Sequence, residues 1–242
     1  MNMPVAFEPC RPTLLETTTA VSYPVRRVFC VGRNYEAHAR EMGRDPDREP
    51  PFFFTKWAET VVNADPQDAC HIAYPPETHN FHFEVELVVA IGAAGFRIDT
   101  AQAEQAIWGY AVGLDMTRRD LQLEARDLGR PWDTGKNVER SSPMGRLVAK
   151  DASRANGFDP GAGRITLSVD GIAKQDADLA ELIWPVEDIV AHISRFYRLA
   201  PGDLIFTGTP AGVGAVVPGN RLLGEIAGLP PLEITIAPPA GS

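Results

Sequence analysis

The segment of residues 81–92, FHFEVELVVAIG, limits the fold of this chain more than any other part of its sequence. Successive side chains of a strand point to opposite faces, which here gives two sets: Glu84, Glu86, Val88 and Ala90 on one face, and Val85, Leu87, Val89 and Ile91 on the other. Because both sets are largely apolar, we expect a strand inside a sheet that is covered on both sides. The two carboxylates in such a strand need a separate explanation.

Glu84 and Glu86 point the same way, with side chains about 7 Å apart at their base. Two buried carboxylates repel each other and destabilise the fold unless a cation neutralises them. Asp115 ends another apolar segment, residues 108–115, and could supply a third oxygen. Three carboxylates without a soft ligand suit Mg²⁺ or Mn²⁺. A solvated strand edge with alternating glutamates is the alternative interpretation, and His82, which shares the same strand face, also leaves open an iron or zinc site or a packed histidine.

The rest of the chain indicates many short strands and few helices. We expect strands at residues 27–31, 52–56, 108–115, 165–170 and 204–206, with a hairpin turn at Asp170-Gly171. We expect helices at residues 34–42 with Asn34 as N-cap, at 100–106, from a Thr117–Asp120 capping box to Leu128, and at 188–198. This pattern favours a β-rich α+β fold. We expect residues 1–24 to form an N-terminal arm or edge segment, and residues 25–242 to form the main domain.

Charge and cysteine content restrict the partners and the compartment. The 242 residues include 32 acidic and 23 basic ones, a net charge of −9 without a basic cluster, which argues against nucleic acid. The longest uncharged apolar stretch, residues 87–96, has about half the length of a membrane span, so we expect no membrane partner. No secretory signal is expected at the start. Cys10, Cys30 and Cys70 lack metal-type spacing and are expected to be reduced thiols of a cytoplasmic protein.

His38 and Glu41 stand three residues apart in the expected helix at 34–42, so their side chains can meet. A carboxylate beside an imidazole orients it and raises its basicity, as a general base requires. An incidental pair on an exposed helix is the alternative. The proline-rich loop that follows favours a mobile lid over residues 35–48.

Two glycine-rich stretches do not fit a nucleotide-binding loop. Residues 129–136, GRPWDTGK, place five residues rather than four between the glycines, and Asn137 follows the lysine where Ser or Thr is required. Residues 208–214 contain no lysine. Both stretches are better interpreted as turns that let the backbone approach a small ligand.

Several separated motifs between residues 28 and 232 resemble the fumarylacetoacetate hydrolase family: CVGRNYEAHAREM, FHFEVELVVAIG, GYAVGLDMTRRDLQ, GRPWDTGK and PGDLIFTGTPAGVG. The stretch DPDREPPFFFTK adds a likeness to bacterial members of gentisate-type aromatic degradation. The resemblance implies a mixed β-sandwich roll, a homodimer, and a Mg²⁺ or Mn²⁺ site. It also implies metal-dependent hydrolysis of the carbon–carbon bond of an acylpyruvate, a small dicarboxylic 2-oxo acid, with fumarylpyruvate as the preferred substrate.

By position, the resemblance assigns the predicted site residues. The metal ligands are Glu84, Glu86 and Asp115; the catalytic residues are His38, Glu41 and Lys136; the substrate-binding residues are Arg119, Gln122 and Thr209. The chain departs from the family pattern at Trp57, which replaces a proline after Lys56, and at Asn137, and we expect both to reshape the pocket. Oxaloacetate decarboxylation, isomerisation of hydroxymuconate-type acids and dehydration of sugar-derived 2-oxo acids use the same platform and stay open. A non-catalytic metal-binding module is a further alternative.

Overall fold

The computed structural model describes residues 6–8, 11–41, 50–64 and 70–240, and for Ala39 and Glu41 only the backbone. Its centre is a mixed sheet of eight strands. Their order is β4 (Phe52–Lys56), β3 (Arg27–Gly32), β15 (Asp203–Phe206), β8 (Val85–Ile91), β9 (Ile107–Leu114), β11 (Ser142–Met144) and β5 (Val61–Asn63), with β12 (Val148–Ala149) paired to β9. Strand β15 is parallel to β3 and antiparallel to β8, so this sheet is joined by segments far apart in the sequence.

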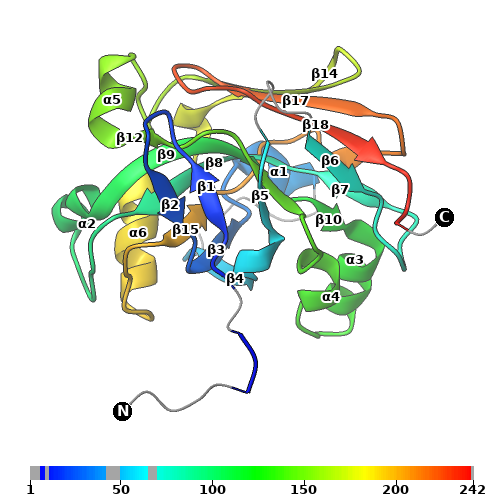
Figure 1. The fold of residues 1–242 in the computed structure, drawn as a ribbon, viewed down its shortest axis with the longest axis horizontal. Helices are drawn as coiled ribbons and strands as arrows, with labels where there is room; N and C mark the ends of the chain where they lie inside the picture. The colour runs from blue at the N-terminus through cyan, green and yellow to red at the C-terminus, as the bar shows by residue number, and fades with distance from the viewer. Residues whose placement is uncertain (1–5, 9–10, 42–49, 65–69, 241–242) are drawn as a thin grey trace.

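A second sheet of five strands lies over the first (Figure 1). Its order is β14 (Ile172–Asp178), β13 (Arg164–Val169), β17 (Arg221–Ile226), β18 (Leu232–Ala237) and β6 (Cys70–Ala73). Strand β7 (Phe81–Phe83) pairs with β10 (Thr117–Arg118) and β16 (Gly214–Ala215) in a small third sheet, and β1 (Leu14–Glu16) pairs with β2 (Ser22–Pro24). The described helices are short: α1 (Glu36–Glu41), α2 (Thr100–Ala106), α3 (Arg119–Asp127), α4 (Asp133–Lys136), α5 (Lys150–Ala155), α6 (Val186–Ser194), and the 3₁₀ turns η1 (Ala58–Thr60) and η2 (Leu179–Glu181).

The two faces of β8 are those that the alternating sequence predicts. Val85, Leu87, Val89 and Ile91 belong to the large core that also contains the inner residues of the five-stranded sheet. Val88 and Ala90 belong to a second core on the opposite face, which the β1–β2 hairpin helps to cover. Burial on both faces explains the almost continuous apolar sequence, and the β-rich sandwich that we expect is confirmed.

The N-terminal hairpin is fixed to the central sheet by Tyr23, whose hydroxyl donates to the carbonyls of Ile91 (2.8 Å) and Asp203 (3.1 Å). The division into an arm and a catalytic domain at residue 24 stays a prediction. The Asp170-Gly171 turn is confirmed, with φ of 51° and 78° as a type I′ hairpin requires. Helix α6 begins directly after Pro185 and ends at Ser194, earlier than expected.

Three local expectations are wrong. The segment 81–91 is not one strand, because β7 and β8 are separated at Glu84. Asn34 does not cap helix α1, which begins at Glu36; its side-chain amide instead donates to the carbonyls of Trp184 and Thr207 and accepts from the Trp184 N–H. Helix α3 begins at Arg119 without a side-chain cap, so the Thr117–Asp120 capping box does not form.

Within the described ranges, no helix is both long and apolar enough to cross a membrane. Cys30 and Cys70 are buried and free of disulfides, while Cys10 lies outside the described residues. Burial, with a smaller contribution from nearby carboxylates, raises the pKa of the Cys30 thiol well above its usual value, so this thiol is not a reactive nucleophile.

Candidate active site

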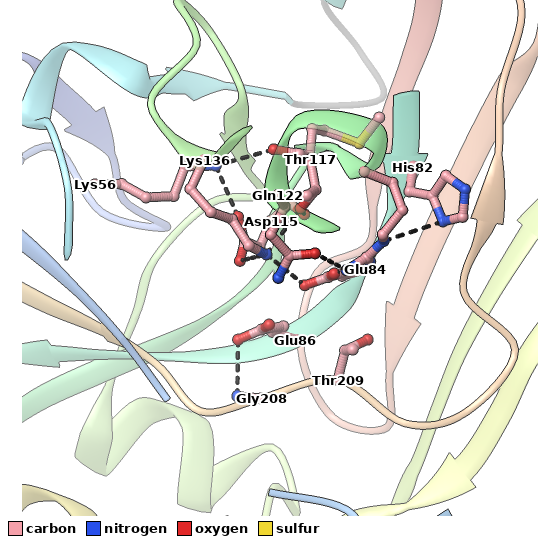
Figure 2. Close-up of polar contacts among 12 residues, drawn as sticks. Lys56, His82, Glu84, Glu86, Asp115, Thr117, Gln122, Lys136, Gly208 and Thr209 are labelled. Carbon is pink, nitrogen blue, oxygen red and sulfur yellow. Dashed lines mark hydrogen bonds and ion pairs between the residues drawn. The ribbon is translucent and has the colours of Figure 1, made fainter. Parts of the chain in front are cut away.

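Strands β8 and β9 bring three carboxylates together (Figure 2). Glu84 lies at the junction of β7 and β8, Glu86 lies within β8, and Asp115 follows β9 directly. The Asp115 N–H donates to the Glu84 carbonyl at 2.9 Å, which continues the antiparallel pairing by one residue. One oxygen from each carboxylate lies within 4.8 Å of the others, and all three residues are buried. A solvated strand edge is therefore excluded.

Cationic side chains surround this triad. The Lys136 ammonium donates to Glu84 Oε2 at 2.9 Å, to Asp115 Oδ2 at 2.6 Å and to the Thr117 hydroxyl at 2.8 Å. The Arg119 guanidinium donates to Glu84 Oε1. Burial alone would lower the pKa of Lys136, but Asp115 and Glu84 hold it above its usual value. Lys136 is therefore a fixed positive charge and not a proton acceptor.

Glu86 is the least neutralised member of the triad. Its Oε2 accepts the N–H of Gly208 at 2.7 Å. Burial, and then the charges of Asp115 and Glu84, raise the pKa of Glu86 well above its usual value. The pKa of Glu84 is lowered instead, because Lys136 and Arg119 outweigh the effect of its burial. A buried cluster of oxygen donors with one poorly compensated carboxylate fits a hard divalent cation such as Mg²⁺ or Mn²⁺.

His82 does not join this cluster. Among the described residues, the group that could hold a metal consists of the three carboxylates. The His82 ring contacts Asn80 Oδ1 at 2.8 Å and accepts from Arg119 Nε at 3.5 Å. The interpretation of His82 as a packed histidine is therefore favoured over an iron or zinc site.

The predicted substrate-binding residues come from helix α3 and the loop after β15. Arg119 Nη1 donates to Gln122 Oε1 at 2.5 Å, one turn further along the helix. The Thr209 hydroxyl donates to the Val85 carbonyl and accepts from Gln175 Nε2, both at 2.8 Å. Thr209 thus connects its loop to β8. In this structure its hydroxyl proton is engaged by the Val85 carbonyl.

His38 lies on helix α1 with its side chain buried. It reaches the same pocket as the carboxylates and the α3 residues. Glu41 is the last residue of α1, but its side chain lies outside what the structure describes. The His38–Glu41 pair therefore stays a prediction. Half of the expected lid over residues 35–48 falls in the range 42–49, which also lies outside the described residues.

One pocket, with about 520 Å³ of space that is partly open to solvent, unites these groups. Its lining includes the predicted residues His38, Glu84, Glu86, Arg119, Gln122, Lys136 and Thr209. Asp115 is fully buried beneath it. The stretch at residues 129–136 contributes Lys136 through helix α4, and its lysine faces carboxylates rather than a phosphate site.

The sequence reasoning missed several residues of this site. Lys56 is fully buried and donates to Asp115 Oδ1 at 2.7 Å. Phe52 and Phe54 line the pocket from the same strand, together with Trp132. The spacing 52, 54, 56 in FFFTK places two rings and an ammonium on one strand face, which is a signal that the sequence did contain.

The two departures from the family pattern lie beside each other. The Trp57 N–H donates to Asn137 Oδ1 at 2.7 Å. Neither residue lines the pocket, and the Trp57 side chain is 54% exposed. The expectation that they reshape the pocket stays a prediction.

Comparisons with known proteins agree with this geometry. Residues 27–237 match the family described as "Fumarylacetoacetate (FAA) hydrolase C-terminal". A fumarylpyruvate hydrolase of Ralstonia sp is 48% identical over 199 residues, which cover 81% of this chain and 99% of the relative. An oxaloacetate tautomerase of Escherichia coli (strain K12) is 35% identical over 202 residues, covering 84% of this chain and 89% of that protein.

A solved structure is also similar over almost its whole length. It is the fumarylpyruvate hydrolase of Pseudomonas aeruginosa in complex with Mn²⁺ and pyruvate. The two chains share 51% sequence identity with a TM-score of 0.92, and the match covers 97% of this chain and 99% of that one.

Proposed function

This chain belongs to the fumarylacetoacetate hydrolase family, and from that premise we propose that it hydrolyses fumarylpyruvate to fumarate and pyruvate. The observation that carries the proposal is the convergence of His38, the buried carboxylate triad and the cations Arg119 and Lys136 on one pocket. The fumarylpyruvate hydrolases of Ralstonia sp and Pseudomonas aeruginosa, which match 81% and 97% of this chain, support the choice of substrate.

Glu84, Glu86 and Asp115 would hold one Mg²⁺ or Mn²⁺ ion, since they offer three clustered oxygen donors. The ion would supply a Lewis acid for the 2-oxo acid end of the substrate. The Mn²⁺ and pyruvate bound to the Pseudomonas aeruginosa protein support this assignment.

The pyruvoyl end of the substrate is assigned to Arg119 and Lys136. Arg119 can pair with the carboxylate through its planar guanidinium, and Gln122 holds that guanidinium from one side. Lys136 keeps its proton and places positive charge where the enolate of pyruvate develops.

His38 is assigned the role of general base. It takes a proton from water, whose oxygen bonds to the carbonyl carbon of the fumaryl group. The bond from that carbon to the methylene then breaks, and its electron pair leaves on the methylene as pyruvate enolate. His38 returns the proton to the methylene carbon of the enolate, and the newly formed carboxylic acid releases its own proton to solvent. Fumarate, pyruvate and this released proton account for all atoms of substrate and water. Glu41 would orient the imidazole.

A second candidate is a reaction on oxaloacetate, such as its decarboxylation. The Escherichia coli oxaloacetate tautomerase favours this candidate, because it matches most of the chain. Enolisation or decarboxylation of oxaloacetate needs no activated water, and the position of His38 in the pocket therefore favours hydrolysis.

A substrate panel tests the two candidates. The purified protein with Mn²⁺ is given fumarylpyruvate, maleylpyruvate, acetylpyruvate and oxaloacetate, and loss of the enol absorbance and release of pyruvate are followed. We expect the highest kcat/KM for fumarylpyruvate, with equal amounts of fumarate and pyruvate. Faster turnover of oxaloacetate than of any acylpyruvate would assign the protein to the second candidate.

The proposal also covers the pathway, the compartment and the oligomeric state of the protein. We assign the protein to gentisate-type aromatic degradation, as a cytoplasmic homodimer whose residues 25–242 form the catalytic domain. Cys30 and Cys70 are buried and form no disulfide, which is consistent with a reducing compartment. Sedimentation equilibrium measures the oligomeric state directly, and a monomer at micromolar concentration would contradict the assigned dimer.

A further inference from the structure

A wall of aromatic rings, formed by Phe52, Phe54 and Trp132, lines the pocket between two cationic side chains. The Lys136 ammonium lies 4.9 Å from the centre of the Phe54 ring. Trp132 packs against both Phe54 (5.5 Å) and Phe52 (5.7 Å). At the other end, the Arg33 guanidinium lies 5.1 Å from the centre of Phe52. All five residues line the pocket, so the wall has a cation at each end.

The backbone holds Arg33 in a costly conformation. Its φ of 56° lies in the left-handed region, which a residue with a long side chain rarely adopts. The preceding Gly32 lies directly against Phe52, and a Cβ there would come within 1.9 Å of the Phe52 ring. Such a strained residue persists when the surrounding structure requires it, and it is typical of ligand-binding positions.

Helix α3 presents a second arginine at the same pocket. Arg119, Gln122 and Arg126 are spaced by three and four residues, so they lie on one stripe of the helix. All three line the pocket. Seven residues of helix separate the two arginines by about 10 Å along the axis. Arg126 pairs with the exposed neighbour Asp127 at 2.8 Å, a weak surface contact that a ligand carboxylate can join.

We propose that Arg33 and Arg126 bind the second carboxylate of the substrate, the one on its acyl side. This inference rests on the proposed function, and it extends that function to a selection for dicarboxylic acylpyruvates. One carboxylate then meets Arg119, with Lys136 beside the adjoining 2-oxo group, and the other carboxylate meets Arg33 and Arg126. The flat, conjugated acyl chain lies between them along Phe52, Phe54 and Trp132, where rings provide apolar contact without hydrogen-bond demands.

Kinetics with a substrate pair test this subsite. Fumarylpyruvate carries the second carboxylate and acetylpyruvate does not. We expect Arg33→Gln and Arg126→Gln to lower kcat/KM for fumarylpyruvate by about 10- to 100-fold, the worth of a charge-assisted hydrogen bond, and by much less for acetylpyruvate. The matched control is Arg97→Gln, because Arg97 also has a positive φ (54°) and lies over a phenylalanine ring, yet it is not part of this pocket. It should leave the ratio of the two kcat/KM values unchanged.

A binding experiment is independent of hydrolysis. 2-Oxoheptanedioate and 2-oxoheptanoate have the chain length of fumarylpyruvate and differ only in the terminal carboxylate. Isothermal titration in the presence of Mn²⁺ should show that the unaltered protein binds the diacid more tightly by at least about 10-fold. Arg33→Gln and Arg126→Gln should remove most of this preference and leave the affinity for pyruvate within about twofold.

The outcomes separate this inference from the proposed function. If the unaltered protein prefers the diacid but hydrolyses no acylpyruvate, the second-carboxylate site stands and the proposed function fails. If it hydrolyses acylpyruvates but the variants lose activity equally on both substrates, or lose none, the assignment of Arg33 and Arg126 is wrong. Circular dichroism shows whether each variant is folded, and either arginine variant alone is sufficient for the test.

Discussion

At the scale of single residues, the site depends on a local balance of charge. Glu84, Glu86 and Asp115 are opposed by Lys136, Arg119 and Lys56, and all six are buried. Lys56 also fixes the backbone around the triad, because its ammonium donates to the carbonyls of Met116 (3.2 Å) and Ser141 (3.1 Å). It therefore connects strand β4 to the segments on both sides of helix α3.

We expect Lys56→Met to lower the free energy of unfolding by about 3–5 kcal/mol, because it leaves Oδ1 of the buried Asp115 and two carbonyls without the Lys56 ammonium, with only Lys136 still paired to that carboxylate. Urea unfolding monitored by circular dichroism, with chelator present, measures this loss. Lys150→Met is the matched control. Lys150 pairs with the partly exposed Glu104 away from the pocket, and its loss should cost about 1 kcal/mol or less. Equal losses in the two variants would mean that Lys56 is not essential to the site.

The role of His38 is tested by the contrast between two reactions. His38→Ala should lower kcat for fumarylpyruvate hydrolysis by roughly 10²–10⁴-fold, the usual contribution of a positioned base, with little change in pyruvate affinity. Any oxaloacetate decarboxylation should fall much less, because it needs no activated water. His71→Ala, an exposed histidine on β6, serves as control. Equal losses in both reactions would show that His38 shapes the pocket instead of activating water.

At the scale of helices and strands, the alternation of side chains predicted the two faces of β8 correctly, whereas Asn34 and Thr117 did not mark the helix starts that we expected. The faces of β8 follow from the sequence because each side chain's direction is fixed by its neighbours. Asn34 and Thr117 precede helices as caps do, but their side chains bond elsewhere: Asn34 to residues 184 and 207, and Thr117 to Asp115 and Lys136. The side chain of a potential cap residue can hydrogen-bond any nearby backbone group. The local sequence does not reveal which backbone group the fold will place beside it.

Asp120 illustrates this at the start of α3. Its carboxylate accepts from the Thr78 hydroxyl (2.6 Å), the His79 N–H (3.0 Å) and the Leu121 N–H (3.0 Å), which fastens the loop before β7 to the helix that carries Arg119. Burial would raise the pKa of Asp120, but these hydrogen bonds lower it overall. The stabilisation is therefore present above the pKa of the unfolded chain, about 3.9, and is lost as the pH falls below it.

We expect Asp120→Asn to lower the free energy of unfolding by about 1–2 kcal/mol at neutral pH, and the difference from the unaltered protein to shrink as the pH falls below about 4. Urea unfolding at a series of pH values measures this difference in the free energy of unfolding. Asp127→Asn, at the exposed end of the same helix, should show no such narrowing. A difference that stays constant with pH would exclude the Asp120 charge as its cause.

At the scale of the whole molecule, the site is assembled by strand order, which no local pattern encodes. Strand β15 lies between β3 and β8, and this places Gly208 against Glu86 and the loop with Thr209 in the pocket. The positions of Lys136 and Arg119 followed from family resemblance, while alternation alone indicated Glu84 and Glu86. The sequence did not indicate the aromatic wall and its two cations, because Arg33, the two phenylalanines of β4 and Trp132 come from three segments that only the folded chain brings together.

The same assembly predicts how a metal ion affects the stability of the folded chain. Because the triad exists only in the fold, Mn²⁺ at about 100 times its Kd should add roughly 2.7 kcal/mol, or about 5–10 °C in Tm. Glu86→Gln keeps an acceptor for the Gly208 N–H but removes a buried charge beside two carboxylates. In chelator we therefore expect this variant to be at least as stable as the unaltered protein, while most of its response to Mn²⁺ is lost. Differential scanning calorimetry with and without Mn²⁺ measures both effects, and Glu104→Gln, a partly exposed carboxylate away from the pocket, should retain the full response. A full Mn²⁺ response in Glu86→Gln would place the ion elsewhere than on this triad.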